Sequence, residues 1–146
     1  MAKTPRPSGA PQNVILAGLP KQQFESLSQY LTYVDLKVKQ AIYEPSAKIS
    51  YAYFVDAGMI SVVSNMEDGR TIEIGTIGRE GMAGSILLLG VDQVPYQYFV
   101  QIAGHAYRIS AATLKAECNR NRSLENEANC SANIDFAALS NASRSS

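Results

Sequence analysis

The sequence has few of the residues from which metal sites are built. Its 146 residues include one histidine, His105, and two cysteines, Cys118 and Cys130, which lie late in the chain among polar neighbours. A mononuclear catalytic metal needs about three clustered histidine or carboxylate ligands. We therefore expect no metal and no cofactor, and we predict that the chain is not an enzyme. Both cysteines are expected to be reduced.

Excess charge of one sign and long apolar runs are also missing. Lysine and arginine number 13, as do aspartate and glutamate, so the formal net charge is zero, whereas a domain that coats nucleic-acid phosphates is usually basic. No apolar run approaches the length that spans a bilayer, and no continuous apolar segment follows Lys3 and Arg6, so no signal peptide is indicated. These absences predict a cytoplasmic protein that binds no membrane.

The composition predicts one folded domain with polar ends. Apolar residues make up 46% of the chain and charged residues 18%, which is typical of a globular domain. Residues 1–12 carry three prolines and indicate a disordered leader. We expect the domain over residues 13–118, because residues 119–146 are rich in asparagine and serine and predict a disordered tail.

Short β-strands are predicted for the middle of the chain, after one amphipathic helix from Lys21 to Leu31. Turn signals recur between the strands, among them Asp56-Ala57-Gly58 and Gly104. The segments expected as strands are 34–38, 41–43, 51–55, 59–64, 71–74, 96–102 and 105–109.

A second helix is expected after the last strand. Ser110 can cap a run of good helix formers, and a continuation to about Ala128 is compatible with the sequence. Together these elements predict a mainly β protein, a small antiparallel jelly roll (double-stranded β-helix) with an N-terminal helix and a C-terminal helix.

The stretch Met66–Gly84 carries the strongest local signals. Asp68-Gly69 predicts a tight turn, and the alternation of Ile72, Ile74 and Thr76 with smaller or polar residues predicts a strand with one buried side. Three glycines then recur at a spacing of three, and the apolar run 86–89 predicts a short helical turn that Gly90 ends. The three glycines are Gly78, Gly81 and Gly84. Strand, bend and helical turn in this order can present N–H groups to an anion; a plain structural turn is the alternative.

Several short motifs together resemble the sensory domain of Crp/Fnr-type bacterial transcription regulators. The resemblance covers roughly residues 14–118 and rests on YFVDAG at 53–58, EDGR at 67–70, IGREGMAG at 77–84, VQIAG at 100–104 and RI at 108–109. It implies a cyclic-nucleotide-binding jelly roll that responds to a small-molecule effector. It also implies dimerisation through a long helix after the roll, and a C-terminal helix-turn-helix domain that binds DNA.

Two features of the family members that bind cyclic nucleotides are missing. Ser85 replaces the glutamate that holds the ribose hydroxyl, and no lysine or arginine lies between Arg79 and Arg108 to pair with the cyclic phosphate. Burying a phosphate without a cation or a full set of N–H donors is costly. We therefore predict a roll without tight affinity for cyclic AMP; a receptor that uses backbone amides of the bend is the alternative. The residues expected to line the vestigial pocket, unless they simply pack the roll, are Gly81, Gly84, Ser85, Ile86, Tyr96 and Gln97.

The residues after the roll do not predict a helix-turn-helix. Such a unit needs two packed helices, and the only large apolar residues after Glu117 are Leu124, Ile134, Phe136 and Leu139. We expect no direct DNA binding from this chain and a homodimer through the C-terminal helix. The chain is interpreted as a regulator truncated before its DNA-binding domain, with a stand-alone sensory module as the alternative.

Overall fold

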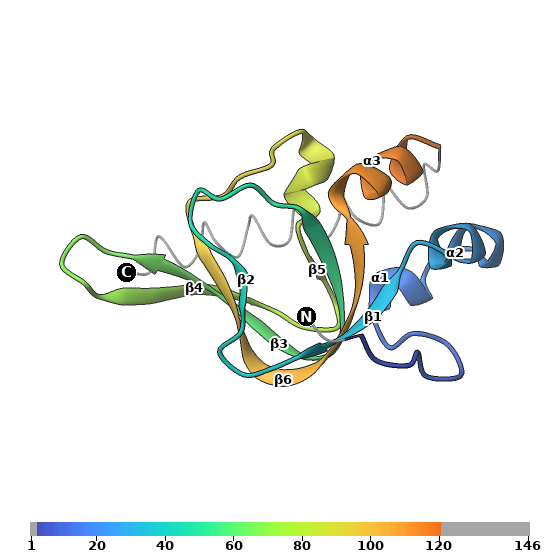
Figure 1. Cartoon of the computed structure of the whole chain (residues 1–146), viewed down its shortest axis with the longest axis horizontal. Helices are drawn as coiled ribbons and strands as arrows, with labels where there is room; N and C mark the ends of the chain where they lie inside the picture. The colour runs from blue at the N-terminus through green and yellow to red at the C-terminus, as the bar shows by residue number, and fades with distance from the viewer. Residues whose placement is uncertain (1–2, 121–146) are drawn as a thin grey trace.

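The computed structural model describes residues 3–120 and shows a β roll with helices at both ends (Figure 1). The sheet follows the order β1-β6-β3-β4, with β2 paired to β6 and β5 paired to β3. The elements are α1 (Val14–Ala17), α2 (Lys21–Ser28), β1 (Thr32–Leu36), β2 (Ala41–Tyr43), β3 (Tyr51–Asn65), β4 (Thr71–Ile77), β5 (Met82–Ala83), the 3₁₀ helix η1 (Ser85–Leu89), β6 (Gln97–Ser110) and α3 (Ala111–Arg120). The predicted mainly β jelly roll with N- and C-terminal helices is confirmed.

The two long strands β3 and β6 form the centre of the sheet, although the sequence predicts each of them as two shorter strands. The register between them shifts around Ala57 and Met59, so each chain bulges instead of turning back. Gly58 has a φ of +93°, and a Cβ on Gly104 would lie 2.0 Å from the Ala57 carbonyl oxygen. The predicted turns at Asp56-Ala57-Gly58 and at Gly104 are therefore wrong: both are bulges where two backbones approach closely.

The hairpin between β3 and β4 turns where the sequence predicts. Gly69 has a φ of +88°, and its N–H donates to the Met66 carbonyl at 3.1 Å. Asp68 and Arg70 form an exposed ion pair at 2.7 Å across the turn. The Asp68-Gly69 turn is confirmed.

Strand β4 departs from the predicted alternation near its end. Thr76 is exposed and Ile77 is buried, whereas strict alternation puts Thr76 on the buried side. The register passes from the pair Val62–Gly75 to the pair Val63–Glu73 and omits Ile74. One extra residue in a bulge reverses the faces of the residues beyond it, which explains the exchange.

Two short helices precede the roll. The helix predicted from Lys21 to Leu31 is present as α2 and ends earlier, at Ser28. The residues before it form a further short helix, α1, whose N-terminus is capped by Asn13: the Asn13 side-chain oxygen accepts the Leu16 N–H at 3.2 Å. Apolar residues of this region enter the core: Ile15, Leu16, Leu19, Leu27 and Leu31.

Residues 3–12 lie against the roll and α2. The Thr4 N–H donates to the Tyr33 carbonyl at 2.9 Å. The Arg6 guanidinium donates to the carbonyls of Ser28 at 3.0 Å and Leu31 at 2.5 Å, near the end of α2. A cation is favourable beside the last carbonyls of a helix. The predicted disorder of the leader and the domain boundary between residues 12 and 13 stay predictions.

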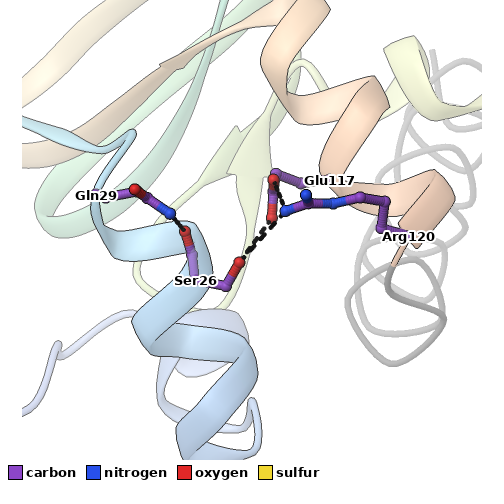
Figure 2. Close-up of polar contacts among 4 residues, drawn as sticks. All are labelled: Ser26, Gln29, Glu117 and Arg120. Atoms are coloured by element: carbon purple, nitrogen blue, oxygen red, sulfur yellow. Dashed lines mark hydrogen bonds and ion pairs between the residues drawn. The ribbon is translucent and has the colours of Figure 1, made fainter.

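Helix α3 packs on the roll and η1 through Leu114 and Cys118, which are both buried. Glu117 is 4% exposed, and its carboxylate accepts hydrogen bonds from Arg120 of the same helix and from Ser26 of α2, the latter at 3.3 Å (Figure 2). Because a buried carboxylate needs such donors, this cluster ties α2 to α3.

The described residues end at Arg120. The predicted tail over 119–146 and the continuation of the helix to about Ala128 lie, from residue 121 on, outside the described residues. The same holds for Cys130 and for most of the segment in which the sequence predicts no helix-turn-helix.

Candidate functional site

The glycine-rich stretch runs from the end of β4 through β5 into η1. The Gly81 N–H closes a turn on the Gly78 carbonyl at 3.1 Å, and the Glu80 carboxylate accepts the Gly78 N–H at 3.1 Å. Gly84 follows β5 with a φ of +94°, a region that favours glycine, and η1 begins directly after it. The predicted order of strand, bend and helical turn is confirmed, with the positive φ at Gly84 and not at Gly78 or Gly81.

Asn13 holds this stretch from the N-terminal side. Its side chain is fully buried, and its amide group donates to the carbonyls of Gly81 at 2.8 Å and Val55 at 2.7 Å. The neighbouring Val14 N–H donates to the Arg79 carbonyl at 2.8 Å. Asn13 is not among the predicted site residues, although an asparagine directly before an apolar helical run is a capping signal.

Asp56 fixes the same N-terminal segment to β3. Its carboxylate is buried, and it accepts the Gln12 N–H at 2.7 Å and the Tyr33 hydroxyl at 3.0 Å. Burial, followed by the hydrogen bond to Asp56, raises the pKa of Tyr33 far above its ordinary value. Tyr33 is therefore a neutral hydrogen-bond donor at physiological pH.

Three tyrosines pack together next to Gly84. The Tyr43 ring centroid lies 4.9 Å from that of Tyr98 and 6.2 Å from that of Tyr53. The Tyr43 hydroxyl donates to the Tyr51 carbonyl at 2.6 Å, and a Cβ on Gly84 would lie 2.7 Å from that hydroxyl. Burial raises the pKa of Tyr43 well above its ordinary value, and the neighbouring tyrosines add to the shift. The Gly84 backbone is thus packed against a neutral phenol.

The six predicted pocket residues fall in two segments: Gly81, Gly84, Ser85 and Ile86 in the bend and η1, and Tyr96 and Gln97 at the entry to β6. The first three are buried, and Ile86 and Tyr96 pack half-buried on the core. Gln97 pairs with Val63 near the end of β3, whereas Gly84 contacts Ala52 near the start of that strand. Strand register does not place the two segments side by side, and their role as a pocket stays a prediction.

A cation reaches this part of the sheet from β6. Arg108 pairs with Tyr53 on β3, and Tyr53 pairs with Ala83 on β5, so the three side chains share one face. The guanidinium carbon of Arg108 lies 4.3 Å from the centroid of the Tyr51 ring. Burial raises the pKa of Tyr53, and the charge and hydrogen bond of Arg108 oppose part of that rise. Within the bend itself, residues 78–84, the only lysine or arginine is Arg79, which is exposed.

His105 contacts an acidic and an aromatic side chain of β1. Its Nε2 lies 3.1 Å from the Asp35 carboxylate, and its ring stacks on Tyr33 with centroids 5.2 Å apart. Within residues 3–120, no group of three or more histidine, cysteine or acidic residues is arranged to hold a metal ion. In that same part of the chain, no helix has the length and apolar character needed to cross a bilayer.

The fold is an antiparallel roll in which a glycine-rich bend leads into a short helix, with helices at both ends. The family model of the cyclic nucleotide-binding domain matches residues 33–121, more than half of the chain. The chain belongs to the cyclic nucleotide-binding domain family, and the predicted resemblance to the sensory domain of Crp/Fnr-type regulators is confirmed at that level.

Solved structures with the same fold include transcription regulators and a kinase subunit. The c-di-GMP-responsive global regulator CLP of Xanthomonas campestris has a TM-score of 0.69 at 13% identity, over 84% of this chain and 62% of its own. The catabolite activator protein of Thermus thermophilus has a TM-score of 0.67 at 13% identity, over 86% and 60%. The regulatory subunit of a cAMP-independent protein kinase A from Trypanosoma cruzi, bound to guanosine, has a TM-score of 0.70 at 12% identity, over 91% and 46%.

These similarities show the fold. This chain spans 62%, 60% and 46% of the lengths of the three proteins, so each of them contains further regions that have no counterpart in the match. The comparison with curated proteins found no match.

Proposed function

We propose that the chain is the sensory domain of a Crp/Fnr-type transcription regulator, a non-enzymatic module that binds a small-molecule effector in the cytoplasm. Membership of the cyclic nucleotide-binding domain family supports this function. The regulators among the solved structures of the same fold support it further.

The packing of Tyr43 against Gly84 carries the second part of the proposal, that cyclic AMP is not bound tightly. The Tyr43 hydroxyl fills the space beside Gly84 that a Cβ would take, and it is held there by its hydrogen bond to the Tyr51 carbonyl. Ser85 stands in the position of the family's ribose-binding glutamate and is 5% exposed. A phosphate buried here would lose its water without a buried cation to replace it, because Arg79, the cation of the bend, is exposed, and this is unfavourable.

The proposal includes a homodimer and no DNA binding by this chain alone. A formal net charge of zero supports the latter. Over its described residues, α3 exposes Ala112, Lys115, Ala116 and Asn119 and buries Leu114. A dimer through this part of α3 would therefore use small and polar side chains, and not a stripe of large apolar ones.

Isothermal titration calorimetry of the purified chain tests the ligand proposal. We expect cyclic AMP and cyclic GMP to bind with dissociation constants weaker than about 100 μM, or less than about 5.5 kcal/mol. Adenosine is the matched control, because it lacks the phosphate; cyclic AMP is expected to bind no more than a few-fold better than adenosine. Micromolar binding of either cyclic nucleotide would overturn the proposal.

One observation favours the alternative of a receptor that uses backbone amides. Gly84 has the left-handed conformation that lets a backbone approach a ligand, and it precedes η1. Two other amides of the bend and η1 already donate hydrogen bonds within the protein. The Gly81 N–H donates to the Gly78 carbonyl, and the Leu87 N–H donates to the Gly84 carbonyl at 3.0 Å. Micromolar binding together with chemical-shift changes confined to residues 84–86 would support this alternative.

A further inference from the structure

Arg108 is a half-buried cation on the same face of the sheet as Tyr53. Its guanidinium lies over the ring of Tyr51, which is 40% exposed, and its charge opposes part of the rise in the pKa of Tyr53. A guanidinium stacked on an aromatic ring keeps N–H donors in its own plane, and these match the two oxygens of a carboxylate or phosphate.

The charge of Arg108 is not balanced by a carboxylate in the described part of the chain. Within residues 3–120 the ion pairs between carboxylates and arginines are Asp68–Arg70 and Glu117–Arg120, Asp35 contacts His105, and none of these contacts includes Arg108. A partly desolvated guanidinium is a favourable place for an external oxyanion, because a charge-assisted hydrogen bond is about twice as strong as a neutral one.

The position of Arg108 relative to the bend is set by strand register. Arg108, Tyr53 and Ala83 lie side by side on β6, β3 and β5, so Arg108 and Ala83 are two strand spacings apart, about 10 Å. Gly84 follows Ala83 directly. Strand pairing thus brings Arg108, at the end of β6, to the face of the sheet that carries Tyr53 and Ala83.

We propose that Arg108, stacked on Tyr51, is the point at which this domain recognises the oxyanion of its effector, a small organic carboxylate or phosphate. The inference rests on the proposed effector-binding function and names the chemistry of the ligand. It also agrees with the proposal that cyclic nucleotides are not bound tightly, because the anion binds beside Tyr51. It does not bind against the Gly84 backbone, which Tyr43 covers.

Two-dimensional NMR titrations of the ¹⁵N-labelled chain test this assignment. The probes are 5′-AMP as a phosphate, 4-hydroxybenzoate as a carboxylate, and adenosine as an uncharged control. We expect at least one oxyanion to shift the Arg108 side-chain N–H and the amides of Tyr51 and Ala83, with a dissociation constant of about 1 mM or tighter. Adenosine is expected to leave these signals unchanged. Which of the two oxyanions binds better distinguishes a phosphate effector from a carboxylate effector.

The matched variants are Arg108→Gln and Arg79→Gln, since Arg79 is the exposed arginine of the bend. We expect Arg108→Gln to weaken oxyanion binding at least tenfold and Arg79→Gln to leave it unchanged. Arg108→Lys keeps the charge and loses the planar fork, so it is expected to bind several-fold more weakly than the parent chain. If Arg108→Gln does not fold, the oxyanion affinity of Arg108→Lys is compared with that of the parent chain instead.

Unchanged affinity in Arg108→Gln would overturn the assignment. If that binding shifts residues 84–87, the effector-binding function stands and only the role of Arg108 is refuted. The absence of shifts with every probe would count against both.

Discussion

Gly84 and Gly90 share a left-handed backbone conformation and differ in their surroundings. A Cβ on Gly84 would lie 2.7 Å from the Tyr43 hydroxyl and 3.2 Å from the Cα of Ala52, at a φ of +94°. Gly90, at +82°, has no atom within 4 Å of that position. Comparing substitutions at the two glycines therefore separates the free-energy cost of the backbone conformation from the cost of the packing between the bend and the roll.

Alanine substitutions should therefore destabilise the chain unequally. We expect Gly90→Ala to lower the free energy of unfolding by about 1 kcal/mol, through the conformational penalty alone. Gly84→Ala is expected to cost about 2–4 kcal/mol, because overpacking against Tyr43 is added. Urea unfolding at pH 7 measures both values. Tyr43→Phe in the Gly84→Ala background should recover part of the loss, and equal losses for the two glycines would contradict the packing seen here.

Helices α2 and α3 are joined by the buried carboxylate of Glu117. Its partners differ in exposure, since the Arg120 side chain is 64% exposed and the Ser26 hydroxyl is part-buried at 3.3 Å (Figure 2). Removing the carboxylate charge leaves Arg120 free to be solvated. The cost is therefore smaller than for a pair in which both charges are fully buried.

We expect Glu117→Gln to lower the free energy of unfolding by about 1–2 kcal/mol. Glu25→Gln, on the exposed side of α2, is the matched control and should change it by less than about 0.5 kcal/mol. Thermal or urea unfolding followed by circular dichroism measures the difference. If the two variants were equally stable, the contact between α2 and α3 would contribute nothing measurable.

Buried tyrosines on both faces of the sheet make the stability of the whole molecule sensitive to alkali. Burial is the largest cause of a raised pKa at each of them, and they are Tyr33, Tyr43, Tyr53 and Tyr107. In the unfolded chain the tyrosine pKa is about 10. A raised pKa in the folded chain means that the unfolded chain loses the proton first, so this contribution is complete below about pH 10 and is lost as the pH rises further.

The free energy of unfolding is therefore expected to show no tyrosine-dependent change between about pH 7 and 9 and to fall steeply above about pH 10. Urea unfolding at half-unit intervals up to pH 11 gives the profile. Tyr43→Phe should make the alkaline decline shallower, because phenylalanine has no proton to lose. An unchanged slope in that variant would show that Tyr43 ionises as easily in the folded chain as in the unfolded one.

Local residue patterns predicted much of this molecule. The local signals are the turn at Asp68-Gly69, the glycines before a short apolar run and the strand-forming segments around them. Each depends on residues only a few positions apart, and the structure has these features where the sequence predicts them. The helix that Ser110 begins is also in place, with the Ser110 hydroxyl accepting the Thr113 N–H at 3.2 Å. The motifs that resemble Crp/Fnr-type sensory domains led to the correct family.

Long-range register decided the rest. Whether Asp56-Ala57-Gly58 and Gly104 turn the chain or only bulge it depends on the strand that lies opposite. The two segments lie opposite each other on β3 and β6, and pairing between these strands makes both of them bulges. Asn13 meets Gly81, and Arg108 meets Tyr51, across long separations in sequence that no local pattern reports. The sequence by itself determined the fold class, because periodicity and turn chemistry are local. Only the tertiary structure decided that Arg108 lies over Tyr51, because strand pairing selects the neighbours of Arg108.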